Sequence, residues 1–165
     1  YYPASIITAI NKLWASQADV LTPRSKLSLI ASELSRRNYN GRVYAKAQNV
    51  RPTYIRAYDA ALANVDLLVM PTCIMTAPKN HTPGSYLEAV EDNLATANSK
   101  GSRNTLPFNY TGHPALALPV GKSSGGLPVS MQIVGRFFED PLVMRAAYAY
   151  QQSTDWDNII GVDFR

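Results

Sequence analysis

The chain has 165 residues, which is about the length of one domain. Apolar residues make up 46% and charged residues 17%, so the composition excludes disordered and fibrous proteins. A formal net charge of +4, scattered with no basic run longer than Arg36–Arg37, is only weak evidence for a nucleic-acid-binding protein.

Two further features narrow the class of protein. The single cysteine, Cys73, excludes an internal disulfide framework and a multi-cysteine zinc site. The longest apolar stretch, Val65–Met70, is far too short to cross a membrane, and no targeting segment is visible. The abrupt start at Tyr1-Tyr2-Pro3 leads us to expect a fragment or a processed chain.

Helical periodicity dominates the first 62 residues. One apolar face covers Ile6–Trp14, and a second helix is expected after Thr22, a good N-cap residue, with its end at Asn40-Gly41. A third helical pattern runs over Val43–Leu62, where Pro52 is expected to kink or split the helix.

Strand patterns follow. The predicted strands are Leu67–Met70, Ala115–Pro119 and Val129–Val134. The segment Gly121–Gly126 between the last two is typical of a hairpin loop. Because apolar strands need cover on both faces, the pattern indicates an α/β fold in which these strands belong to a larger sheet.

The remaining segments are predicted as two helices, several loops and a tail. A weaker helix covers about Tyr86–Ala97, and a closing helix covers Asp140–Gln152 with Asp140-Pro141 as cap and first turn. Loops are predicted over Asn98–Asn104 and over Asn104–Ala115, and Ser153–Arg165 is predicted as a polar tail.

Few side chains suggest chemistry by themselves. His81 and His113 lie in different predicted loops without a metal-ligand spacing, so both are expected to be solvated or structural. Cys73 follows a strand end, but a lone cysteine is usually inert packing. The run Lys122–Gly126 holds serines, glycines and a lysine, yet a hairpin tip does not fix a nucleophile beside a base.

The segment Asn104–Ala115 is a candidate for a ligand-binding pocket. It contains prolines, a glycine, aromatic residues and short polar side chains just before an apolar strand. Such a segment suits either a pocket lining or a rigid connector, and composition does not separate the two.

Three collinear stretches resemble the amidase signature family. They are Arg56–Thr72, Pro107–Gly121 and Gly126–Phe138. Their order, and their spacing from the closing helix, resemble the C-terminal third of such an enzyme, most densely over Val43–Gln152. The resemblance implies the C-terminal part of an α/β/α layered fold with a mixed sheet and helices on both faces, incomplete on its own.

The resemblance also implies a domain organisation. Residues 1–165 would be the C-terminal segment of a single amidase domain. Residues 1–62 would be mainly helical, 63–152 would supply strands and helices of the core sheet, and 153–165 would be the tail.

Family members hydrolyse carboxamides through an acyl-serine intermediate, with a catalytic Ser-Ser-Lys set in the N-terminal two-thirds of their chain. No catalytic residue is therefore expected here, nor any cofactor or metal. Ser123-Ser124 falls between the second and third stretches, so it does not take the catalytic role. The segments shaping the acyl site map onto Thr72, Cys73, Ile74, Asn104, Thr105, Phe108 and Asn109.

These side chains are neutral, with Arg103 as the one nearby base, so an apolar or aromatic acyl group is expected rather than an anion. The expected partners are the N-terminal part of the same enzyme, a small-molecule amide and a second copy in a homodimer, without nucleic acid or membrane. A cytoplasmic location is expected. A non-catalytic relative that kept the scaffold and the amidase subunit of an amidotransferase remain alternatives.

Overall fold

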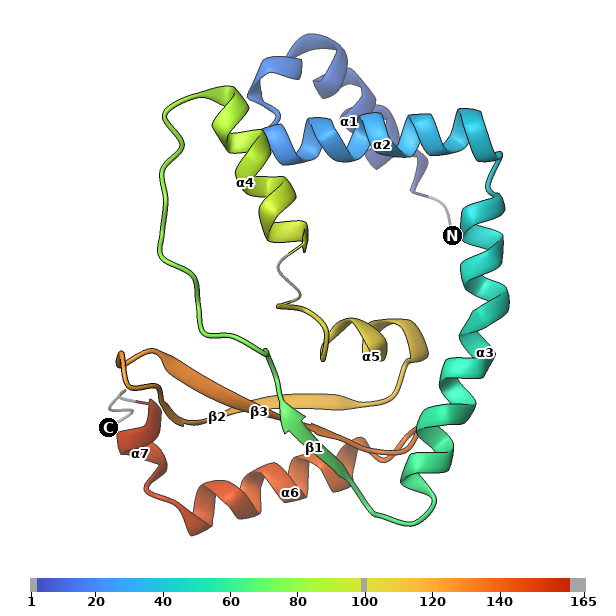
Figure 1. Ribbon diagram of the computed structural model, residues 1–165. Coiled ribbons are helices and arrows are strands. Elements are labelled where there is room, and N and C mark those ends of the chain that lie inside the picture. Colours follow the sequence, from blue (N-terminus) through green and yellow to red (C-terminus); the bar gives the residue numbers. More distant parts are fainter. Residues whose placement is uncertain (1–2, 99–100, 161–165) are drawn as a thin grey trace. The chain divides into compact units, whose positions relative to one another are not determined.

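A computed structural model describes residues 3–98 and 101–160 of the chain (Figure 1). The chain divides into two compact units, one of residues 1–43 and 81–99 and one of residues 44–80 and 100–165. The first unit is helical, and the second contains the sheet.

Helices α1 (Ala4–Ser16), α2 (Pro23–Tyr39) and α4 (Tyr86–Asn98), with the short 3₁₀ turn Ala18–Val20, form the first unit. The side chain of Thr22 accepts a hydrogen bond from the backbone N–H of Ser25, which confirms the predicted N-cap of α2. Asn40 ends that helix in the left-handed region with φ of 45°, as expected for a C-cap. Helix α4 packs against α2, where the Lys26 ammonium lies 5.5 Å from the centre of the Tyr86 ring.

Helix α3 (Arg42–Leu62) leads into the second unit and is continuous through Pro52. Of the two alternatives expected at Pro52, a kink or a split, the split is therefore wrong. Pro52 and Gln48 are both exposed, so the Gln48 carbonyl that loses its usual amide donor faces solvent and can bond to water.

The sheet contains β1 (Leu68–Pro71), β2 (Ala115–Lys122) and β3 (Pro128–Val134) in the order β1-β3-β2. Both pairings are antiparallel, so the mixed character expected for the family sheet is not present among these strands. The predicted hairpin between β2 and β3 is confirmed, with Ser123 N donating to Leu127 O at 2.8 Å and Gly126 at φ of +77°.

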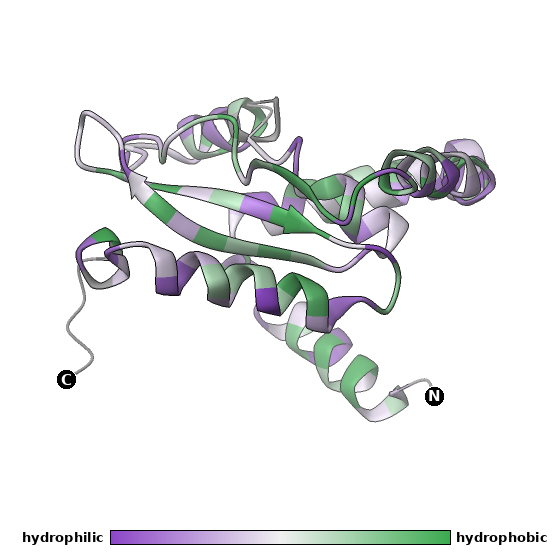
Figure 2. Cartoon of the chain, turned by 90° about the horizontal axis from the view of Figure 1, so that it is seen from below, coloured by the Kyte–Doolittle hydropathy of each residue, from purple (hydrophilic) through white to green (hydrophobic). Residues whose placement is uncertain are grey.

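Helix α6 (Asp140–Ser153) covers one face of this sheet. The buried side chains Leu118, Ile133, Val143 and Ala147 form the core between them. Helix α5 (Leu106–Thr111) lies on the opposite side of the strands from α6 (Figure 1). Hydrophobic residues predominate along the strands, whereas α6 alternates hydrophobic and hydrophilic residues along its length (Figure 2). The α/β prediction with helices on both faces is confirmed.

Gly135 sets how closely α6 approaches the end of β3. A Cβ placed on Gly135 would lie 2.7 Å from Cγ2 of the buried Val143. Only a residue without a side chain fits between the strand and the helix at this point.

Two segments differ from the sequence predictions. The predicted loop Asn104–Ala115 contains α5, which has a proline in its first turn and ends at Gly112 with φ of +93°. The predicted polar tail contains the short helix α7 (Trp156–Ile160), and Trp156 packs against the core beside α6. Residues 161–165 and two residues of the predicted loop Asn98–Asn104, 99 and 100, lie outside the described part.

Two smaller differences concern element ends and cover. Helix α6 begins at Asp140 itself, with Glu139 in the N-cap position. Strand β1 is not covered on both faces, because Val69 is 61% exposed. No helix in the described part of the chain combines the length and the apolar character needed to span a bilayer.

Candidate functional site

Two segments of the predicted site lie together at the end of β1. The side-chain amide of Asn104 donates to the carbonyl oxygen of Pro71 at 2.6 Å, although 33 residues separate them. The backbone carbonyl of Asn104 accepts a hydrogen bond of 2.8 Å from Nε2 of Gln132, a buried residue on β3. Asn104 therefore joins the segment before α5 to the end of β1 and to the neighbouring strand β3.

Thr72 continues the strand ladder by one residue, because its N–H donates to the carbonyl of Ser130 at 3.0 Å. Its Oγ1 is buried and has no hydrogen-bond partner among the described residues. A buried hydroxyl without a partner is unfavourable, so this oxygen lacks a polar partner that the described residues do not supply. Cys73 and Ile74 follow and are exposed.

The other predicted residues lie on or next to α5. Thr105 precedes the helix and donates from Oγ1 to Ser102 O at 3.2 Å. Phe108 is buried, with its ring centre 5.0 Å from that of Tyr58 on α3, while Asn109 is exposed. Phe108 thus anchors α5 to α3, and Asn109 is the side chain of the pair that is open to a ligand.

One stripe of α3 that sequence reasoning did not single out holds α5 in place. Arg51 donates from Nε to Tyr110 O at 2.6 Å and from Nη2 to Thr111 O at 3.4 Å. The Tyr54 and Tyr110 rings meet edge to face at 5.7 Å, and the Tyr110 hydroxyl donates to Ala47 O. Ala47, Arg51 and Tyr54 lie at helical spacing along one face of α3, and periodicity predicted the helix without indicating that α5 lies on this face.

His113 joins α3 to the segment that follows α5. Its side chain is fully buried, with Nδ1 3.0 Å from Oγ1 of Thr111 and Nε2 3.2 Å from Oδ1 of Asp59. The imidazole also lies 4.3 Å from the Phe137 ring, measured between ring centres. Of the two alternatives expected for His113, solvated or structural, the structure supports the structural one.

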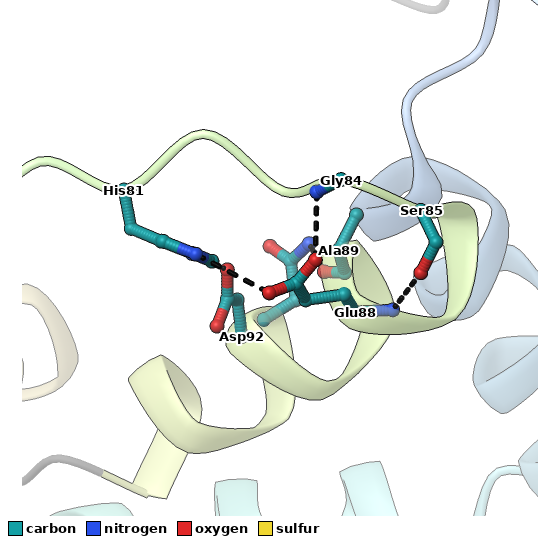
Figure 3. Close-up of polar contacts among 7 residues, drawn as sticks. His81, Gly84, Ser85, Glu88, Ala89 and Asp92 are labelled. Carbon is teal, nitrogen blue, oxygen red and sulfur yellow. Dashed lines mark hydrogen bonds and ion pairs between the residues drawn. The ribbon is translucent and has the colours of Figure 1, made fainter.

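His81 belongs to the other unit and has a different environment. Its ring nitrogens lie 2.7 Å from Asp92 and 3.3 Å from Glu88, both on α4 (Figure 3). The hydrogen bond to Asp92, its charge and the charge of Glu88 together raise the pKa of His81 above its ordinary value. Glu88 also accepts from Gly84 N at 2.6 Å, and its own N–H donates to Ser85 Oγ, so this cluster caps α4 (Figure 3).

The first unit also has a surface hollow of about 440 Å³. It is lined by Trp14, Leu21, Arg24, Ser25, Ser28, Leu29 and Ser32. None of the predicted site residues lines it. Within residues 3–98 and 101–160, no group of three or more His, Cys, Asp or Glu side chains is arranged to hold a metal ion.

A family model described as Amidase matches residues 8–144. The chain belongs to the amidase family. It is 34% identical over 151 residues to a glutamyl-tRNA(Gln) amidotransferase subunit of Synechococcus sp. (strain WH7803), covering 86% of this chain and 29% of that protein. It is 38% identical over 138 residues to an uncharacterized protein in the nthA 5′ region of Rhodococcus erythropolis, covering 82% of this chain and 65% of that protein.

Solved amidase structures share the fold. The 6-aminohexanoate cyclic dimer hydrolase complexed with substrate superimposes with a TM-score of 0.61 and 26% identity, over 84% of this chain and 29% of that chain. A glutamyl-tRNA(Gln) amidotransferase subunit of Thermotoga maritima gives a TM-score of 0.52 and 27% identity, over 73% of this chain and 24% of that chain. The chain thus spans less than a third of the two amidotransferase subunits and of the cyclic dimer hydrolase, and 65% of the Rhodococcus erythropolis protein.

The structure brings together the two segments that hold the predicted pocket residues. Thr72, Asn104 and Thr105 lie at or next to the hydrogen bonds that join β1, β3 and the segment before α5, whereas Phe108 packs on Tyr58 of α3. Sequence reasoning missed Gln132, whose only signal was a polar residue inside the apolar run Val129–Val134.

Proposed function

We propose that this chain forms one wall of the acyl pocket of an amidase that hydrolyses a carboxamide to a carboxylate and ammonia or an amine. In this proposal residues 1–165 are part of a single amidase domain. The wall consists of Thr72–Ile74 at the end of β1 and of Asn104, Thr105 and Asn109 next to it, with Phe108 fastening α5 from behind.

The observation that carries the proposal is the hydrogen bond from Asn104 to Pro71. It places two segments that the family resemblance assigns to the acyl site, distant in sequence, at one end of the sheet. The unpartnered hydroxyl of Thr72 at the same place adds a polar group able to bond to a substrate amide.

The chemistry itself would come from the Ser-Ser-Lys set that the family resemblance implies. The serine oxygen would attack the amide carbon, the amine would leave with a proton, and water would then release the carboxylate from the acyl-serine. The residues of this chain would bind and orient the acyl group, because its described site residues include no nucleophile paired with a base.

The wall suggests which amides suit the site. Its candidate residues are uncharged, and Ile74 presents an apolar side chain that is 49% exposed. An apolar or aromatic acyl group such as that of benzamide therefore fits better than an anionic one.

The second candidate is the amidase subunit of an amidotransferase. It is favoured by the likeness to glutamyl-tRNA(Gln) amidotransferase subunits from Synechococcus and Thermotoga maritima. In either case we propose a cytoplasmic enzyme in which this chain pairs with the N-terminal part of the same enzyme. In the amidase case we also propose a homodimer.

The test is ammonia release from benzamide and from acetamide by the product of the complete open reading frame. We expect hydrolysis of benzamide with the larger kcat/KM. Ile74→Ala should raise KM for benzamide about threefold to tenfold, because it removes apolar contact worth about 1 kcal/mol, and leave that for acetamide nearly unchanged. Leu127→Ala, at an exposed position in the β2–β3 hairpin, is the matched control.

Each other outcome has a definite meaning. Ammonia release that requires glutamyl-tRNA would favour the amidotransferase reading. A folded product that releases ammonia from no carboxamide, with or without glutamyl-tRNA, would contradict both enzyme readings and favour a non-catalytic scaffold.

A further inference from the structure

We propose that Asp59 on α3 is a positioning residue that, through His113, determines where helix α5 lies. The inference deepens the proposed function, on which it rests for its consequence, since α5 carries Phe108 and Asn109 of the pocket wall. Among the described residues, the hydrogen bond of the Asp59 carboxylate is to His113, which is not one of the candidate pocket residues.

The geometry forms a chain of three polar groups. Oδ1 of Asp59 lies 3.2 Å from Nε2 of His113, and Nδ1 of His113 lies 3.0 Å from Oγ1 of Thr111 at the end of α5. A carboxylate oxygen only accepts, so Nε2 of His113 carries the hydrogen in this bond. The imidazole is thereby fixed in orientation, and its other nitrogen is directed at the Thr111 hydroxyl.

Burial prevents water from replacing His113 and Thr111 in this chain of hydrogen bonds. The side chain of His113 is 0% exposed, Thr111 is 0% exposed, and the Asp59 side chain is 50% exposed. If Asp59 is removed, water reaches the place of its carboxylate but not Thr111, so His113 loses its fixed partner while still enclosed by aromatic rings.

Other contacts do not replace this one. Arg51 bonds to the backbone carbonyls of α5, and Phe108 packs on Tyr58, so both hold α5 against α3. Among the described residues, the Asp59–His113–Thr111 chain is what joins side chains of α3, of the segment before β2 and of the last residue of α5. It acts on the same end of α5 as Arg51, but through the Thr111 side chain and the segment that leads into the strand.

The experiment is hydrogen exchange, read by mass spectrometry, on the product of the complete open reading frame. In Asp59→Ala we expect the amides of α5 to exchange about tenfold faster, as for a lost hydrogen bond to a charged group, while those of α6 stay unchanged. Asp59→Asn keeps an acceptor oxygen at the same place and should restore exchange to within about threefold of the wild type. Asp66→Asn, an exposed aspartate beyond α3, is the control and should change neither helix.

A second background tests the route through His113. In His113→Phe, which keeps the aromatic packing but has no ring nitrogen, Asp59→Ala should add no further increase in α5 exchange. A full tenfold increase in this background would show that Asp59 acts on α5 by another route and would overturn the proposal. So would equal increases in α5 and α6, which indicate a global loss of stability, or no increase in either.

The consequence for substrate is read separately. Asp59→Ala should raise KM for benzamide about threefold to tenfold and leave kcat within about twofold, because positioning of the wall affects binding. An unchanged KM in an active enzyme would overturn the proposed effect of Asp59 on substrate binding. If the wild type hydrolyses no carboxamide, the proposed function fails, and hydrogen exchange still decides whether Asp59 positions α5.

Discussion

Nδ2 of Asn104 lies 2.6 Å from the carbonyl oxygen of Pro71, and this bond ties the segment before α5 to the end of β1. Asn104→Ala removes the donor and should lower the free energy of unfolding by about 1 kcal/mol. Asn104→Asp should lower it more, by about 2 kcal/mol, because a carboxylate oxygen would face the carbonyl oxygen. Urea unfolding measures both, with the exposed Asn64→Ala as a control. Equal stability of Asn104→Asp and the wild type would show that the bond does not hold the junction.

Gly135→Ala should destabilise the sheet unit by about 1–3 kcal/mol, because the new Cβ would meet Val143. That Cβ would lie 2.7 Å from Cγ2 of Val143, a stiff and buried side chain. Gly125→Ala in the β2–β3 hairpin, where the nearest atom is Ser123 Oγ at 3.8 Å, is the matched control and should change stability by less than about 0.5 kcal/mol. The measurement is the urea midpoint.

If the clash with Val143 is the cause, a second prediction follows for the urea midpoint. In a Val143→Ala background, Gly135→Ala should cost less than in the wild type, because the atom it meets is gone. A cost that is the same in both backgrounds would show that the glycine is needed for another reason.

Arg136 links the end of β3 to the end of α3. Its Nη2 donates to the carbonyl oxygens of Leu62 and Val65 at 2.9 and 2.8 Å, and its Nη1 lies 3.2 Å from Glu139. A lysine has one ammonium and cannot span these acceptors, so Arg136→Lys should lower the unfolding free energy by about 1–2 kcal/mol. Arg145→Lys at an exposed position of α6 is the control and should have little effect. Similar unfolding curves for both variants would contradict this account of Arg136.

His81 should make the helical unit sensitive to pH. Its pKa is raised in the folded chain by Asp92 first and by Glu88 second, so the stabilisation is complete below the ordinary pKa of 6.5. It is lost as the pH rises through the higher, folded-state pKa. Asp92→Asn should bring the pKa of His81 down in an NMR titration, whereas Glu91→Gln on the same helix should leave it nearly unchanged.

The wild type and the Asp92→Asn variant also allow a test by stability. The difference in stability between wild type and Asp92→Asn should be largest below pH 6.5 and should shrink above the folded-state pKa. A difference that grows with rising pH would have the wrong sign and would contradict the ion-pair account.

Local sequence signals predicted most of the helices and strands, but not which of them pack against one another. Thr22 and Asn40 marked the ends of α2 because caps depend on residues a few positions apart. Helix α5 was predicted as a loop, since Pro107 and Gly112 lie so close together that only the contacts with α3 make a short helix stable there. The same holds for the site: the family resemblance pointed to Asn104 and Thr72, whereas the hydrogen bonds of Gln132 and Asp59 join residues far apart in sequence, which no local pattern records.

Cys73 offers the most direct test that a carboxamide binds at the end of β1. Its thiol is exposed and follows Thr72, so an occupied pocket should shield it. The measurement is the rate of Cys73 alkylation by N-ethylmaleimide, read on the Cys73 peptide by mass spectrometry, in the product of the complete open reading frame with and without benzamide. We predict a rate that falls with benzamide concentration and is halved near the KM for hydrolysis. A rate that stays constant while benzamide saturates the enzyme would place the acyl pocket away from Thr72–Ile74 and contradict the account.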